Sequence, residues 1–146
     1  MASMIDQNQG RKVLKVSGVS VEVIPDDGLP WSLRGIWFVP RGPYYVVGDG
    51  VYHKRDIGHS TPWKLYPRGE VTNYYTLAIR GAGRNDVVTA GAFGEIAHFN
   101  GVTWRNFINQ TGISGIYYSV SIKGDLIIAV GYANNRGVVA IGRRTS

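Results

Sequence analysis

Short apolar runs, separated by turns rich in glycine and asparagine, fill most of the chain. Three such runs follow one another in its middle, at residues 77–80, 87–90 and 96–99. Asn100-Gly101, the strongest short signal of a β-hairpin, comes directly after the third run. The pattern predicts three antiparallel strands and the start of a fourth at Trp104. The run at 87–90 is continuous and β-branched, which predicts a strand buried on both faces.

The same pattern recurs along the chain at a nearly constant distance. A strand followed by glycine ends at Gly48, Gly91 and Gly131, which lie about 43 and 40 residues apart. Trp63 and Trp104 lie about 41 residues apart. Repeats of about 40–50 residues are typical of four-stranded propeller blades. We therefore expect an all-β protein of about three four-stranded antiparallel blades, with these three glycines and two tryptophans as structural anchors of the blades.

The N-terminal part carries a fainter copy of the repeat. Residues 13–16 and 19–24 match the third and fourth strands of a blade, and residues 119–144 supply three strands of another. We interpret residues 1–10 as a disordered tail or a remnant of cloning, and residues 11–146 as a single domain. Its blade parts are expected at about 11–32, 33–73, 74–116 and 117–146.

The best-formed repeat resembles the bacterial and phage β-propeller repeats of the BNR and photosystem-assembly-factor (YCF48-like) type. The matching residues are Asn85, Asp86, Val87, Gly91, Gly94, Ile96, His98, Gly101 and Trp104. The Asp-box S-x-D-x-G-x-T-W of BNR sialidases is absent from the sequence. The resemblance covers roughly residues 33–142, and it implies a repeat class rather than an activity.

About three blades are fewer than the four to eight of natural propeller rings. Three arrangements therefore stay open: an oligomer, a piece of a longer polypeptide, or an open β array. A closed dimer would contain six or seven blades. In it, the N-terminal strands of one copy would complete the last blade of the other and hide exposed sheet edges. We favour this homo-oligomer.

The chain is basic, with a formal net charge of +6 and a sequence pI near 9.7. Such a charge suits a nucleic acid or charged glycan partner, but lysines and arginines that guard turns and edges explain it equally simply. The sequence contains no cysteine, no signal peptide and no run of about 20 apolar residues. We expect a soluble protein without a membrane partner, cytoplasmic or virion-associated.

No constellation of residues indicates catalysis, a metal site or a cofactor. His98 is expected to form a hydrogen bond between strands, since a metal ion needs three or four ligands. His53 and His59 flank a polar loop that is either a solvated turn or a functional loop. The carboxylates lie in turns or at strand ends, where aspartate accepts local backbone hydrogen bonds. We therefore expect a protein that is not an enzyme.

Candidate residues for binding an anionic ligand are four cations and one tryptophan. Arg41, Arg80, Arg84 and Lys123 belong to the turns between first and second strands of successive repeats. Equivalent turns gather on one face of a propeller, so these cations would form a positive arc unless each merely solvates its own turn. Trp31 lies in a connector, where it either faces a ligand or covers the adjacent blade.

Three functions follow as hypotheses. The first is a non-enzymatic structural or assembly module, a subunit of a larger complex such as a phage virion or tail, with itself or other structural proteins as partners. The second is a module that binds a glycan or another polyanion. The third is a fragment of a larger secreted propeller.

Overall fold

The computed structural model describes residues 13–30, 32–58 and 61–143, and almost all of its regular structure is β-strand. One short helix, α2 (Ile108–Thr111), interrupts the strands of the described part. The predicted all-β class is confirmed. No helix among the described residues is long and apolar enough to cross a membrane.

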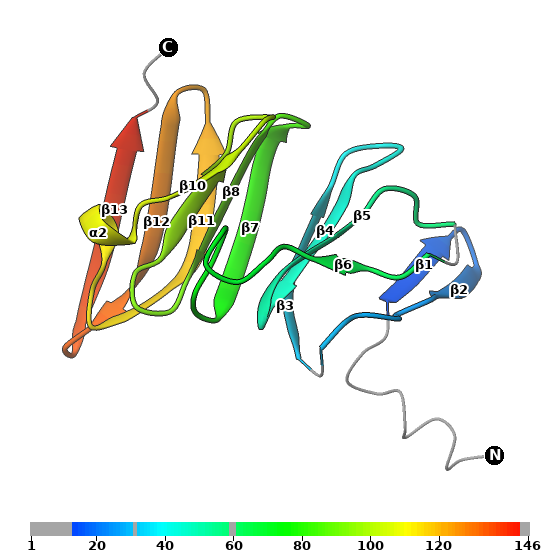
Figure 1. The fold of residues 1–146 in the computed structure, drawn as a ribbon, viewed down its shortest axis with the longest axis horizontal. Helices are drawn as coiled ribbons and strands as arrows, with labels where there is room; N and C mark the ends of the chain where they lie inside the picture. The colour runs from blue at the N-terminus through cyan, green and yellow to red at the C-terminus, as the bar shows by residue number, and fades with distance from the viewer. Residues whose placement is uncertain (1–12, 31, 59–60, 144–146) are drawn as a thin grey trace.

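The strands form four antiparallel sheets, and each sheet uses strands that are consecutive in the chain (Figure 1). The N-terminal hairpin consists of β1 (Val13–Ser17) and β2 (Ser20–Ile24). The second sheet consists of β3 (Leu33–Phe38), β4 (Tyr44–Gly48), β5 (Gly50–Lys54) and β6 (Lys64–Leu65). The third consists of β7 (Thr76–Gly83), β8 (Asp86–Gly91), β9 (Ile96–Phe99) and β10 (Trp104–Asn106). The fourth consists of β11 (Gly115–Lys123), β12 (Leu126–Ala133) and β13 (Arg136–Arg143).

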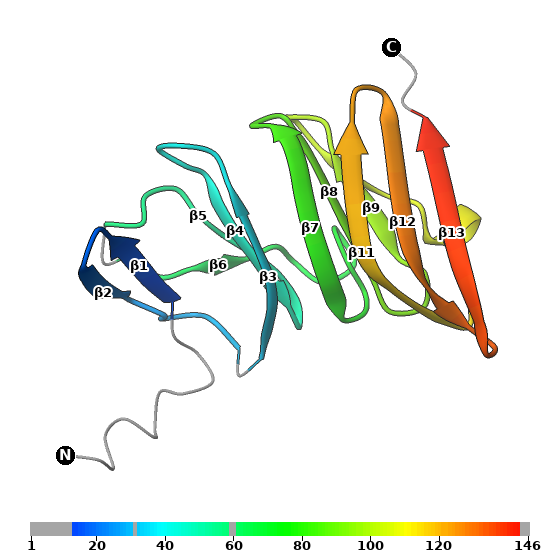
Figure 2. The ribbon, with the colours of Figure 1, turned by 180° about the vertical axis from the view of Figure 1, so that it is seen from behind.

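The four sheets are stacked in a row in chain order, as the two opposite views agree (Figure 1 and Figure 2). An apolar cluster fills each of the three gaps. Val13 and Ile24 of the hairpin pack with Val46 of the β3–β6 sheet. Val47 packs with Ile79 between the next two sheets, and Val88 packs with Ala129 between the last two. Each sheet is therefore stabilised by burying its faces against its neighbours.

Strand β8 is the most deeply buried strand of the stack. Val87 points into the gap on one side and Val88 into the gap on the other, and both are fully buried. This confirms the prediction that residues 87–90 are buried on both faces. β7 is longer than predicted: it extends to Gly83, because a bulge between Gly81 and Gly83 lets it pair as far as Asp86. Arg80 consequently lies within a strand and not in a turn.

The three repeated glycines occupy equivalent positions in their sheets. Gly48, Gly91 and Gly131 lie opposite the first strand, beside a register shift in that strand. A Cβ atom at any of them would lie 1.9–2.2 Å from a backbone carbonyl oxygen of the segment alongside. Only glycine permits this close approach of two chains at a bulge. The repeat of glycine in the sequence therefore marks a repeated bulge.

The repeated tryptophans also occupy equivalent positions. Trp63 packs against the N-terminal hairpin, and its indole Nε1 donates a hydrogen bond to the carbonyl of Pro25 over 3.0 Å. Trp104 packs against Tyr45 and Tyr66 of the preceding sheet. Each tryptophan thus fills the gap between its own sheet and the preceding one, as expected of structural anchors.

Candidate functional site

Apolar side chains are exposed at the N-terminal end of the stack. The hairpin register pairs Leu14 with Val23 and Val16 with Val21, which places these four on one face. They are between 51% and 68% exposed. Beside the hairpin, Ile36 and Phe38 of β3 are also exposed. We call these six residues the N-terminal end face.

A second apolar surface lies at the opposite end of the stack. The register pairs Val130 with Val139, and the same face of β12 and β13 carries Tyr132 and Ile141. Val139 and Ile141 are 62% and 67% exposed, whereas Ala140 between them packs toward the β7–β10 sheet. We call Val130, Tyr132, Val139 and Ile141 the C-terminal end face.

A groove of about 820 Å³ lies next to this end, between β13 and the neighbouring sheet. Residues 139–143 form one wall, and residues from β9, β10 and α2 form the other. Among the described residues, the last sheet has three strands where the two before it have four. The groove therefore lies where a fourth strand would lie, and β13 is an unpaired edge. Arg105 and Arg143 line it, and no described carboxylate does.

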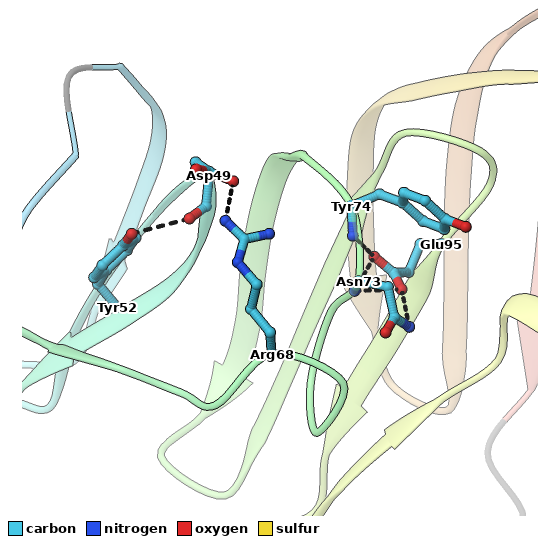
Figure 3. Close-up of polar contacts among 6 residues, drawn as sticks. All are labelled: Asp49, Tyr52, Arg68, Asn73, Tyr74 and Glu95. Atoms are coloured by element: carbon cyan, nitrogen blue, oxygen red, sulfur yellow. Dashed lines mark hydrogen bonds and ion pairs between the residues drawn. The ribbon is translucent and has the colours of Figure 1, made fainter.

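A buried carboxylate fixes the loop that joins the two central sheets (Figure 3). Glu95 is 3% exposed and accepts hydrogen bonds of 2.8–3.1 Å from the backbone and side chain of Asn73, the backbone of Tyr74 and the side chain of Asn106. Nearby, Arg68 forms an ion pair with Asp49 at the surface. Glu95 therefore has a structural role, which the sequence did not distinguish from that of a turn residue.

The predicted cations fall into different surroundings. The turns that carry Arg41, Arg84 and Lys123 lie along the same edge of the stack (Figure 1 and Figure 2). Arg84 joins two of these turns, because its Nη2 donates to the carbonyl of Gly42 over 3.0 Å. Arg80 instead donates to the carbonyl of its neighbour Ile79. Trp31 lies outside the described residues, as does His59.

A pocket of about 610 Å³ opens between the β3–β6 and β7–β10 sheets, close to Arg84. We call it the basic pocket. The cations that line it are Lys54, Arg55, Lys64 and Arg84, and no described carboxylate lines it. Its aromatic side chains are Tyr45, His53, Tyr66 and Phe99. Of these cations, the sequence pointed to Arg84 as part of the arc of turns, and to Lys54 and Arg55 as part of the polar loop that His53 and His59 flank. Lys64 carried no signal, because it lies on a short strand outside the repeated pattern.

The ring of His53 lies inside the basic pocket and stacks on Tyr66, with 4.3 Å between ring centroids. Burial, with the Lys64 charge second, holds the pKa of His53 below its usual value. Burial likewise raises the pKa of Tyr45, with Tyr66 contributing by charge and by hydrogen bonding. The pocket thus combines a neutral aromatic floor with a positively charged rim.

His98 lies on β9 and forms the predicted hydrogen bond between strands. Its Nε2 lies 2.7 Å from Oδ1 of Asp86 on β8. Within the part of the chain that the structure describes, no three histidine, cysteine, aspartate or glutamate side chains gather as a metal site would require.

Comparisons with protein-family models, with curated proteins and with solved structures found no match to this chain.

Proposed function

We propose that this chain is a non-enzymatic assembly module of the β-propeller type, a subunit that joins further copies of itself in a larger complex such as a phage virion or tail. The observation that carries the proposal is the pair of exposed apolar end faces on opposite ends of one stack. Contiguous apolar patches of this kind mark interaction surfaces. The repeat and its resemblance to phage propeller sequences support the propeller type.

The strand arrangement at the two ends suits such a contact. The hairpin covers β4 and β5 through Val46 and Tyr52, and leaves Ile36 and Phe38 of β3 bare. At the other end, three strands are present and a groove takes the place of a fourth. The C-terminal end face of one copy would cover the bare part of β3 in the next copy. The hairpin of that next copy would then lie in the groove beside β13.

Charge favours the same arrangement. Residues 13–27 contain one lysine and three acidic residues, Glu22, Asp26 and Asp27, in a chain whose net charge is +6. The groove that would receive this segment is lined by Arg105 and Arg143. Complementary charge of this kind fixes orientation between partners more than it adds affinity. The unpaired β13 edge would gain main-chain hydrogen bonds by strand addition.

The mass of the protein in solution tests the proposal. We expect a stable oligomer in sedimentation equilibrium, and a monomer when Val139→Asp and Ile141→Asp are combined, because both changes bury charge in the interface. Val102→Asp, at an exposed position of the β9–β10 turn, is the matched control and should keep the oligomer. A monomeric wild-type protein would contradict the proposal and favour a fragment of a larger propeller.

A further inference from the structure

The basic pocket lies between the two central sheets, away from both end faces, so a ligand there is independent of assembly. We propose that it binds a phosphate or sulfate ester whose organic part is a ring. The rim would hold the anionic group and the aromatic floor would stack with the ring. The same ligand chemistry occurs in nucleotides and in sulfated sugars.

The charges around the pocket favour an anion. Arg55, Lys64 and Arg84 come from three separate segments, the loop after β5, β6 and the turn after β7. They converge on one pocket although no described carboxylate lines it. Isolated surface cations are usually solvated one by one. Three converging cations, with no carboxylate among the described residues that line the pocket, create a positive potential that attracts phosphate or sulfate.

A fourth cation, Lys54, belongs to the pocket wall, but its side chain points to the other face of the β3–β6 sheet. Its register partner Tyr44 packs against the hairpin side of that sheet. Its Nζ lies 5.7 Å from the ring centroid of Trp63, which packs against the N-terminal hairpin. The positive charge of the rim therefore comes from Arg55, Lys64 and Arg84.

The floor of the pocket favours a ring over a bare anion. His53 and Tyr66 stack with 27° between their planes, and Tyr66 meets Trp104 edge to face. These contacts hold the rings in place before any ligand arrives, which reduces the entropy lost on binding. Burial and the neighbouring Lys64 charge lower the pKa of His53, which favours the neutral form of its ring. A planar or sugar ring can therefore stack there, while its ester group reaches the rim.

Binding is tested with two probes that share the anion and differ in the ring, phenyl phosphate and inorganic phosphate. We follow the ring resonances of His53 by NMR in the wild-type protein at millimolar concentrations of each probe. We expect phenyl phosphate to bind about tenfold more tightly, since its ring can stack on the aromatic floor and inorganic phosphate has no ring. Adenosine monophosphate and a sulfated disaccharide, titrated next, distinguish the two sources of the ligand.

Two substitutions separate the rim from the floor. Lys64→Gln should weaken both probes about tenfold, the effect of one hydrogen bond to a charged group. Tyr66→Leu should weaken phenyl phosphate but not inorganic phosphate. Lys123→Gln removes the same charge from an exposed position outside the pocket and should change neither affinity.

Three results would overturn the proposal. The first is that neither probe shifts the His53 resonances at millimolar concentration. The second is that inorganic phosphate binds as tightly as phenyl phosphate. The third is that Lys123→Gln weakens binding as much as Lys64→Gln. The last result would assign the affinity to the overall surface charge instead of the pocket. None of them bears on the mass in solution, so the assembly proposal stands or falls separately.

Discussion

The Glu95 carboxylate is the most densely hydrogen-bonded side chain in the described part of the molecule. Glutamine has nearly the same shape as glutamate, but an NH2 group replaces one of the two acceptor oxygens. That NH2 group would face hydrogen-bond donors. We expect Glu95→Gln to lower the free energy of unfolding by about 1–3 kcal/mol, the cost of unsatisfied buried donors. Urea unfolding measures this, with the exposed Glu70→Gln as the control. Equal stability of the two variants would mean that the network does not contribute.

Trp63 and Trp104 are equivalent in the repeat but differ in their indole nitrogens. Trp63 Nε1 donates to Pro25, whereas the buried Nε1 of Trp104 has no hydrogen-bond partner among the described residues. Trp104 is partly buried and packs against the apolar cluster between the two central sheets, so Trp104→Ala should cost about 3 kcal/mol, the lower end of the range for a large buried aromatic. Trp63→Phe should cost about 1 kcal/mol more than Trp104→Phe, because it also removes a hydrogen bond. Thermal and urea unfolding of both pairs check this, and a loss below about 1 kcal/mol for Trp104→Ala would place Trp104 at the surface.

His53 predicts a pH dependence of stability. Burial and Lys64 lower its pKa in the folded protein below 6.5, so in mildly acidic solution the unfolded chain binds more protons than the folded one. Stability therefore falls as the pH drops below about 6.5, and the fall ends below the folded-state pKa. His53→Gln should flatten this part of the profile, measured as urea unfolding against pH. A slope identical to that of the wild-type protein would contradict the environment described for His53.

At the scale of the strands, the stack predicts a gradient of local stability. β8 pairs on both sides and is buried on both faces. β13 pairs with β12 alone among the described strands, and its outer face is exposed. In dilute, monomeric protein, backbone amides on the free edge of β13 should exchange with solvent much faster than those of β8, which require global unfolding. Equal protection of the two strands in hydrogen-exchange NMR would contradict this order.

Strands and their order could be predicted from the sequence because their signals are local. The run at residues 87–90 and the Asn100-Gly101 turn each specify their own backbone, and the glycine repeat marked three equivalent positions. That these positions lie at bulges follows only from the register of each sheet. The length of β7 could not be predicted, since its last residues pair only because a bulge shifts the register. The role of Glu95 could not be predicted for a related reason. Its donors Asn73 and Tyr74 are more than 20 residues away in the sequence, and only the fold brings them together.

At the scale of the whole molecule, sites arise from contacts between repeats, which periodicity does not encode. The basic pocket joins Lys64 to Arg84, and its floor joins Tyr45 to Phe99. Only Arg84 of these four belonged to the predicted arc of cations, and Lys123 lies outside the pocket. Unpaired surfaces at both ends were expected from the repeat pattern, in which the first and last repeats are incomplete. Which side chains remain exposed follows only from the register of each sheet.

The proposed assembly joins two different surfaces, and this head-to-tail geometry makes a prediction of its own. A copy with Val16→Asp and Val23→Asp loses the N-terminal end face, whereas a copy with Val139→Asp and Ile141→Asp loses the C-terminal one. Each variant alone should be monomeric, because every contact needs one intact face of each kind. An equimolar mixture should form a 1:1 heterodimer, since the intact hairpin of the second variant meets the intact groove of the first.

Mass photometry or sedimentation of the two variants and their mixture measures this outcome. Circular dichroism of each variant alone first checks that it is folded. We expect the hairpin variant to fold, because Val13 and Ile24 on the other face of the hairpin still anchor it to the β3–β6 sheet. A symmetric interface, in which one patch meets itself, would leave one of the two variants able to self-associate. A mixture that stays monomeric although both variants are folded would exclude pairing between opposite ends. A heterodimer, in contrast, can form only if the N-terminal end face of one copy binds the C-terminal end face of the other.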